Sequence, residues 1–184
     1  MAAKCEKSDM MAEHFTELWP FALRLYACEG ISPACMRLQD EGGLDVCELL
    51  WLCWLDAHGH TLATPDAAWQ DALVDVRHWQ CSMTRPLRQQ RRLLKPLAER
   101  MPHLTPLRTH LKRAELEAER EALRRLEALA RRGAGIRPWH PHDRPAASLE
   151  ETLARWAGPL PATLNAALLQ IVHAARADAE PKEA

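Results

Sequence analysis

The stretch that most constrains the fold is VCELLWLCWLDA, residues 46–57, because it is apolar around nearly the whole circumference of a helix. One face of that helix, spaced at i, i+3, i+4, i+7, i+8 and i+11, carries Val46, Leu49, Leu50, Cys53, Trp54 and Ala57. The rest of the surface is largely covered by Trp51, Leu52 and Leu55. A helix that is apolar on every side is buried. The run is too short to span a bilayer, which takes roughly 20 residues, so it predicts the central helix of a soluble bundle.

Start and stop signals define this helix and the one before it. Asp45 is the expected N-cap, and Glu48 three residues later completes a pair resembling a capping box. Ser32 followed by Pro33 predicts the N-cap and first position of the preceding helix. That helix should end near Gly43, since glycine suits the left-handed conformation of a C-terminal cap.

An apolar stripe with helical spacing also precedes this pair, from about Asp9 to Tyr26, and Pro20 lies inside it. The helix could kink at the proline, at a cost of up to about 3 kcal/mol. Alternatively, Thr16 caps a new helix that carries Pro20 in its first turn. We favour the second arrangement because it avoids the penalty.

After residue 59, Thr64 followed by Pro65 predicts the start of another helix. The residues expected to face inward from it are Trp69, Leu73, Val76 and Trp79. Pro86 should break or kink that helix, because the residue before a proline avoids helical angles. A further helix is predicted from Pro86 to about Arg100, shortened by Pro96 to roughly its first ten residues. Its inward residues would be Leu87, Leu94 and Leu97.

The longest predicted helix starts at Thr105 and Pro106, ends at Arg132, and spans about 40 Å. A narrow apolar seam runs along it through Leu107, Leu111, Ala114, Ala118, Ala122, Leu126 and Leu129. Such a seam is typical of a coiled coil. The helix therefore either folds back along the bundle or projects and pairs with another chain, and we keep a homodimer through 106–132 as an expectation.

These signals predict an all-α, single-domain bundle of about six to eight helices, without strands. We expect a flexible tail at 1–8, the helical core at 9–132 and a Pro-rich connector at 133–147. C-terminal helices at 148–176 would pack on the core, starting from a capping box of Ser148 and Glu151. Residues 177–184 would form a disordered tail.

The sequence between Leu18 and Leu55 resembles a proteobacterial domain-of-unknown-function family of small helical proteins. The resemblance rests on a W-x-F-x-L-x-x-Y pattern at Trp19–Tyr26, then G-I-x-x-A-C-x-x-L-Q-D at Gly30–Asp40. It continues with G-L-D-V at Gly43–Val46 and an apolar helix ending in Trp54 and Leu55. The family pattern has asparagine after G-L-D-V, whereas this chain has Cys47, which argues against polar chemistry at that position. The resemblance implies an all-α fold and no assigned activity.

Composition gives no sign of a cofactor, a metal or a membrane segment. The N-terminus lacks a charged region followed by an apolar one, so we expect a cytoplasmic protein. Six cysteines are present, at positions 5, 28, 35, 47, 53 and 81, but none forms C-x-x-C, and we expect free thiols. Two histidine pairs, His58 with His60 and His140 with His142, lack the further ligands that a zinc site needs.

The charged residues are distributed unevenly. Residues 1–76 hold 4 Lys or Arg and 13 Asp or Glu, a net charge of −9, whereas residues 77–132 hold 15 and 6, a net charge of +9. Residues 133–184 hold 5 and 6, and the three parts sum to the −1 of the whole chain. This asymmetry has two explanations: the acidic and basic parts pair within the bundle, or the basic part binds an anionic partner.

The basic part contains one helix face whose cations step by three or four residues: Arg85, Arg88, Arg92 and Lys95, with Arg91 beside them. Guanidinium groups at this spacing can bind phosphates or carboxylates. We therefore expect first a non-enzymatic interaction or regulatory protein, with this face, the long helix, or both as its binding surface. An RNA- or ribosome-associated protein that uses the same basic helix is the second hypothesis.

No catalytic motif is present: G-x-S-x-G, a Gly-rich phosphate loop and H-E-x-x-H are all absent. The third hypothesis is a small-molecule pocket or enzyme built around Arg24, Tyr26, Gln39 and Asp45, the polar residues of the family-like stretch. For Asp45 the N-cap role is the stronger interpretation. For Arg24 and Gln39 the alternative is that they tie helix ends together, and the sequence does not choose.

Overall fold

The computed structural model describes residues 15–139 and 145–179. Helices account for 78% of it, which confirms the all-α prediction. The helices are α2 (Leu18–Ala27), α3 (Ile31–Asp40), α4 (Val46–Ala57), α5 (Ala67–Ala72), α6 (Val74–Trp79), α7 (Arg85–Arg100), α8 (Thr105–Arg131), α9 (Pro145–Ala157) and α10 (Ala162–Ala179). A π-helical turn, Gln80–Thr84, joins α6 to α7, and a 3-10 turn, Pro102–Leu104, joins α7 to α8.

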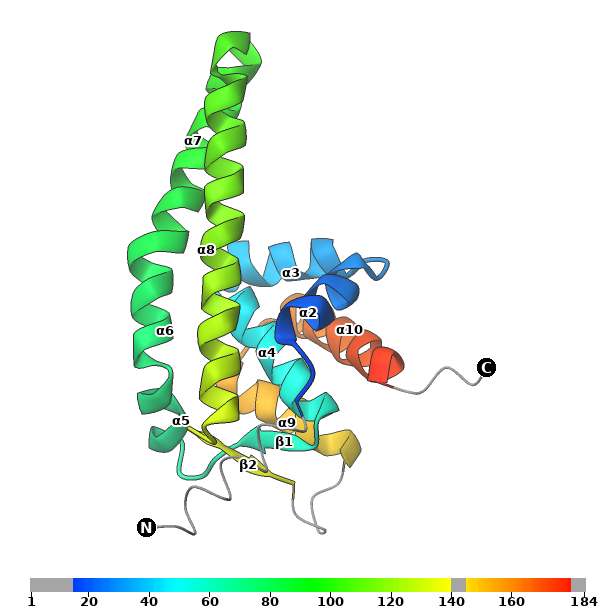
Figure 1. Cartoon of the computed structure of the whole chain (residues 1–184). Coiled ribbons are helices and arrows are strands. Elements are labelled where there is room, and N and C mark those ends of the chain that lie inside the picture. The colour runs from blue at the N-terminus through cyan, green and yellow to red at the C-terminus, as the bar shows by residue number, and fades with distance from the viewer. Residues whose placement is uncertain (1–14, 140–144, 180–184) are drawn as a thin grey trace.

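Helix α4 lies at the centre of the molecule, as its apolar circumference predicts. Every residue from Cys47 to Leu55 is buried, and α2, α8, α9 and α10 surround it (Figure 1). Asp45 caps the helix, because its Oδ1 accepts a hydrogen bond of 3.1 Å from the backbone N–H of Glu48. The side chain of Glu48 does not complete the capping box but turns into the core.

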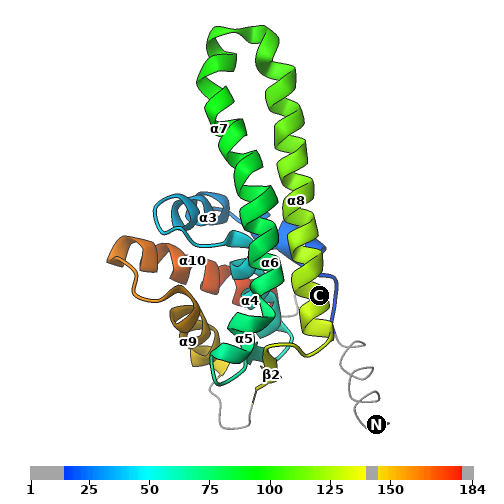
Figure 2. The same cartoon turned by 90° about the vertical axis from the view of Figure 1, so that its left-hand side faces the viewer.

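Helices α7 and α8 form an antiparallel hairpin whose far end stands clear of the rest of the molecule (Figures 1 and 2). No residue of α7 is buried, and the buried residues of α8 begin only at Glu115. We call residues 85–115 the arm. They hold nine Lys or Arg against two acidic residues, a net charge of +7. The C-terminal half of α8 therefore packs against the rest of the molecule, which we call the body, whereas most of the arm is exposed to solvent.

The predicted seam of α8 is divided between these two parts. Ala118, Ala122, Leu126 and Leu129 are buried in the body, whereas Leu107 is 49% exposed. The inner half of the seam thus serves the chain's own core. A homodimer through 106–132 stays a prediction, and only the outer half of the seam is left for it.

The prediction that strands are absent is wrong. Strand β1 (His60–Leu62) pairs antiparallel with β2 (Ile136–Pro138), with Thr61 opposite Arg137. Strands of three residues are too short to show the alternation by which a sequence reveals them. Their pairing joins the end of α4 to the start of the predicted connector, and residues 140–144 of that connector lie outside the described part.

Three predicted helix starts are misplaced, although the helices exist. Helix α3 begins at Ile31 after Gly30, whose φ of 76° is left-handed, so Ser32 is not its N-cap. Helix α2 carries Pro20 in its first turn, as expected, but Thr16 does not cap it. Helix α5 begins at Ala67 rather than at Pro65. At the start of α2, the backbone N–H of Leu18 donates to Glu127 Oε2 at 3.1 Å, a contact distant in sequence that local cap patterns do not contain.

The C-terminal boundaries also differ from the expectation. Helix α9 begins at Pro145, so Ser148 lies inside it and is not a cap. Helix α10 continues to Ala179, three residues into the segment predicted to be disordered, and residues 180–184 lie outside the described part.

Neither Pro86 nor Pro96 ends a helix. Pro86 is the second residue of α7, which begins just after the π-helical turn that ends at Thr84. Pro96 lies inside α7, which runs on to Arg100, so the predicted shortening is wrong. The proline removes one hydrogen bond to the carbonyl of Arg92. Because both residues are exposed, water can hydrate that carbonyl while packing on α8 holds the helix straight enough to continue.

Candidate functional site

A groove of about 680 Å3 lies between the arm and helices α2 and α3. The arm contributes Arg88, Arg91, Arg92 and Lys95 from α7, and Arg108, Lys112, Glu115, Leu116, Glu119 and Leu123 come from α8. The opposite wall consists of Trp19, Ala22, Leu23, Tyr26, Cys35, Met36, Gln39 and Asp40. Helix α4 adds Val46, Cys47 and Leu50. The basic helix and the family-like stretch, which are far apart in sequence, therefore face each other.

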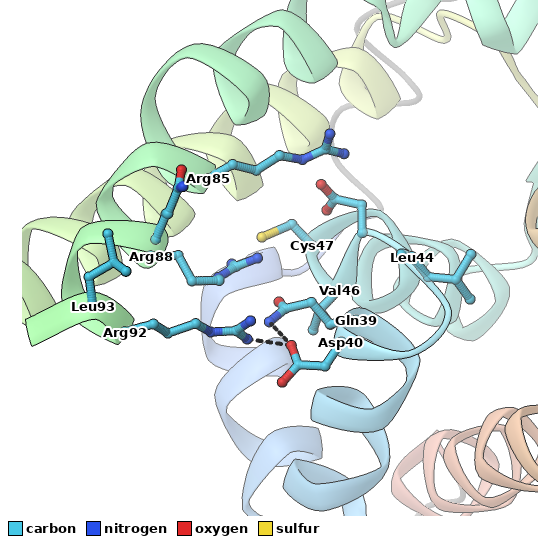
Figure 3. A pocket seen from close by; sticks show the side chains of 12 residues that line it. Gln39, Asp40, Leu44, Val46, Cys47, Arg85, Arg88, Arg92 and Leu93 are labelled. Atoms are coloured by element: carbon cyan, nitrogen blue, oxygen red, sulfur yellow. Dashed lines mark hydrogen bonds and ion pairs between the residues drawn. The ribbon is translucent and has the colours of Figure 1, made fainter. Parts of the chain in front are cut away.

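A second cavity, of about 530 Å3, adjoins the groove. The two share Gln39, Asp40, Val46, Cys47, Arg88 and Arg92. Its other lining residues include Arg85 and Asp45. Figure 3 shows Arg88 and Arg92 extending from one wall toward Gln39 and Asp40 on the other. Arg88 and Arg92 thus stand at the boundary between the two cavities.

Two of the arginines are held by glutamates of α8. The guanidinium of Arg88 donates to Glu115 Oε1 at 3.0 Å and to Glu119 Oε1 at 2.6 Å. Arg91 also donates to both oxygens of Glu115. Burial raises the pKa of the Glu115 carboxyl, but hydrogen bonds from Arg91 and Arg88 outweigh it and the net shift is downward. These pairs fix the two arginines against α8.

A third arginine reaches across to α3. Arg92 Nη2 forms an ion pair with Asp40 Oδ1, and the side-chain amide of Gln39 donates to the same oxygen at 3.3 Å. Partial burial raises the pKa of Asp40, yet the hydrogen bonds from Arg92 and Gln39 prevail and the net shift is downward. The side chains of Arg92 and Asp40 are 46% and 38% exposed, so water and solutes reach this contact.

The remaining cations of the groove are Lys95, Arg108 and Lys112. Within residues 15–139 and 145–179, none of these three forms an ion pair with an acidic side chain. The Nε of Arg108 is buried and has no acceptor. The groove lining contains six cations and three carboxylates, a net charge of +3. The outer end of the groove is therefore cationic and its charge is not neutralised internally.

The inner end is apolar. Four large side chains there are exposed rather than packed: Leu23 at 51%, Tyr26 at 38%, Met36 at 52% and Leu116 at 48%. They come from α2, α3 and α8 and converge on one groove. A contiguous exposed apolar surface rimmed by charge is typical of an interaction site.

The site residues predicted from the sequence do not all lie in one cavity. Tyr26 and Gln39 line the groove together with Arg88, Arg91, Arg92 and Lys95, whereas Asp45 and Arg85 line the second cavity. Arg24 lines neither, and its guanidinium lies 5.9 Å from the centre of the Phe21 ring. Burial raises the pKa of Asp45, whose carboxylate serves as the N-cap of α4.

Sequence reasoning missed Arg108, Lys112, Leu116 and Met36. Arg108, Lys112 and Leu116 form a stripe at i, i+4 and i+8. That stripe lies beside the apolar seam from Leu107 to Leu129, which is the stronger pattern. Nothing in the sequence indicated that Met36 faces the same groove.

Within residues 15–139 and 145–179, no cluster of three or more His, Cys, Asp or Glu side chains could hold a metal ion. His58 Nδ1 donates to the Trp54 carbonyl at 2.7 Å, and its Nε2 accepts from the Thr16 N–H at 3.1 Å. His58 therefore joins the end of α4 to the segment before α2. The five cysteines of the described part are free thiols, and His140 and His142 lie outside that part.

No helix in the described ranges is long and apolar enough to cross a membrane. The model of a family of proteins of unknown function, DUF2390, matches residues 17–126. No curated protein and no solved structure matches the chain. The matched segment begins just before α2 and ends within α8, so it contains every residue that lines the groove and the second cavity.

Proposed function

Because the chain belongs to the DUF2390 family, whose description assigns no activity, we propose a function from the groove itself: the protein binds an acidic segment of a partner protein. The observation that carries the proposal is the meeting of unpaired cations and exposed apolar side chains in one groove. Carboxylates of the partner would pair with Lys95, Arg108 and Lys112. Its apolar side chains would cover Leu23, Tyr26, Met36 and Leu116.

The mixture of side chains favours a protein over a nucleic acid. Protein interfaces combine an apolar centre with a charged rim, and Arg, Met and aromatic residues are enriched in them. A surface that tracks RNA phosphates would instead carry cations along its length with aromatic side chains for stacking. Here the exposed aromatic and aliphatic residues lie at the inner end of the groove, and the cations without an acidic partner, Lys95, Arg108 and Lys112, lie at its outer end.

A pull-down with charge-reversed variants tests the proposal. Lys95→Glu with Lys112→Glu reverses two cations of the groove. Arg100→Glu with Arg113→Glu reverses two cations on the same two helices that line neither cavity, and serves as the matched control. Both variants should keep the fold, because all four side chains are exposed. Tagged wild-type protein and both variants are incubated with cell lysate after nuclease treatment, and the retained proteins are identified by mass spectrometry.

We expect a protein retained by the wild type and by the control variant, and lost from the Lys95 and Lys112 variant by about tenfold or more. Material that disappears on nuclease treatment, with binding that falls steeply as salt rises, would identify RNA as the partner instead. Equal retention by both variants would overturn the proposed site.

A further inference from the structure

We propose that the segment bound in this groove is an α-helix of about four turns, which lies along α7 and α8 and completes a three-helix bundle with the arm. This inference rests on the proposed function and specifies the form of the partner. The helix would place acidic side chains at the outer end of the groove and apolar side chains at the inner end.

The shape of the groove supports a helical occupant. Its α8 lining follows one helix face, with steps of four, three or four residues from Arg108 through Lys112, Glu115 and Glu119 to Leu123. Fifteen residues of helix rise about 22 Å, so the wall is straight over about four turns. The α7 lining follows a parallel stripe from Arg88 to Lys95. Two parallel stripes of this kind form the surface on which a third helix packs.

The two helices of the arm bury few of each other's side chains, so the arm is loosely packed. No side chain of α7 is buried, and large apolar residues on both helices stay exposed, among them Leu93 at 57% and Leu116 at 48%. A helix held on only one side has few buried contacts, and most helical stability in proteins comes from tertiary packing. A third helix in the groove would cover Leu116 and the apolar side chains of α2 and α3.

The positive charge of the arm indicates which kind of helix can bind in the groove. A second copy of the arm would bring a net charge of +7 against an equal charge, and like charges in contact suppress association. An acidic helix complements Lys95, Arg108 and Lys112. The occupant is therefore a helix of another protein that is acidic at one end and apolar at the other.

Synthetic peptides test the conformation of the occupant directly. A fluorescein-labelled peptide of about 16 residues carries glutamates over its first two turns and leucines over its last two, in a sequence of high helix propensity. A second peptide has the same sequence except that two central residues are replaced by proline, which prevents the helix. Binding of both to the full-length protein is measured by fluorescence anisotropy.

We expect the helical peptide to bind at least about tenfold more tightly than the proline peptide. A double-mutant cycle then locates it: Lys112→Gln should weaken the helical peptide but not a version with glutamine in place of its glutamates. At the inner end, Leu116→Ser should weaken binding, whereas Val74→Ser, at another exposed apolar residue that lines neither cavity, should not.

The two proposals fail in different ways. Equal binding of the helical and proline peptides, or binding of neither, overturns the helical occupant. The acidic-segment proposal then still stands if a partner is lost from the Lys95 and Lys112 variant in the pull-down. If retention of the partner in the pull-down does not depend on Lys95 and Lys112, the acidic-segment proposal is wrong. The helical inference, which rests on it, is then wrong as well.

Discussion

The carboxylate of Asp40, at the last residue of α3, forms an ion pair with the guanidinium of Arg92, in the middle of α7. This contact joins the two stretches that carry the strongest functional signals in the sequence, and it stands where the groove meets the second cavity. An acidic partner in the groove would compete with Asp40 for Arg92. The chain thus occupies one cation of its own site.

Removing this competitor should strengthen binding. Asp40→Asn frees Arg92 for the partner, and because exposed ion pairs contribute at most about 1 kcal/mol, we expect the affinity for the helical acidic peptide to rise about two- to fivefold. Glu41→Gln is the matched control: it removes the same charge one residue away, where Glu41 pairs with Arg37 instead. Titration by anisotropy compares the two, and an equal gain in both variants would reduce the effect to general electrostatics.

The buried carboxylate of Glu48 should stabilise the fold. Glu48 is 2% exposed and accepts two hydrogen bonds of 2.8 Å from Arg77 and one of 2.7 Å from Trp156 Nε1. Glu48→Ala leaves both donors without their acceptor. Breaking a buried pair costs about 3–5 kcal/mol, and we expect about 2 kcal/mol here because the Arg77 side chain is 43% exposed.

Chemical unfolding in urea measures this loss. Glu150→Ala is the control, since Glu150 pairs with Arg176 at the surface, where both side chains are at least 30% exposed. It should cost less than about 1 kcal/mol. A Glu48 variant as stable as the Glu150 variant would contradict the assigned role.

Asp56 should make the protein less stable as pH rises. Burial raises the pKa of its carboxyl to about 6, against the influence of Arg176, which lowers it. Between the unfolded pKa of about 3.9 and the folded value, the folded state binds more protons, so stability falls as pH increases through this window. Asp56→Asn removes the penalty, and above pH 7 it should stabilise the protein by about 1–2 kcal/mol, discounted for partial exposure.

The measurement is urea unfolding of the wild type and the Asp56 variant at pH 4.5 and pH 8. The difference between them should be full at pH 8 and should fall to about a third of that at pH 4.5, where the unfolded carboxyl is already largely ionised and the folded one is not. A difference that is constant across this range would mean that the ionisation of Asp56 is not its cause.

The cysteines should differ sharply in reactivity. Cys81 is exposed, whereas burial raises the pKa of Cys35 to about 12 and also raises that of Cys53. Because the thiolate is the reacting species, iodoacetamide at pH 8 should alkylate Cys81 and leave Cys35 and Cys53 unmodified until denaturant is added. Peptide mass spectrometry identifies each site separately. Fast alkylation of Cys35 in the native protein would show that α3 detaches from the core.

The sequence alone determined the elements whose cause is local. The apolar circumference of 46–57 required burial, the position of Asp45 just before that stretch predicted an N-cap, and the i, i+4 pattern of 105–131 required a long helix. These features follow from the 3.6-residue period and from the unpaired N–H groups at a helix start. Both are properties of a few neighbouring residues, so a sequence displays them directly.

Only the tertiary structure decided which faces meet. Tyr26 and Gln39 share a groove with Lys95 and Lys112 because α7 and α8 turn back beside α2 and α3, more than fifty residues away in sequence. Glu48 looked like half of a capping box, but the approach of Arg77 gave its carboxylate a stronger partner in the core. Helical periodicity gives the direction in which a side chain points from the axis of its helix. The partner that it meets depends on how whole helices pack, which is settled by the burial of all their apolar faces together.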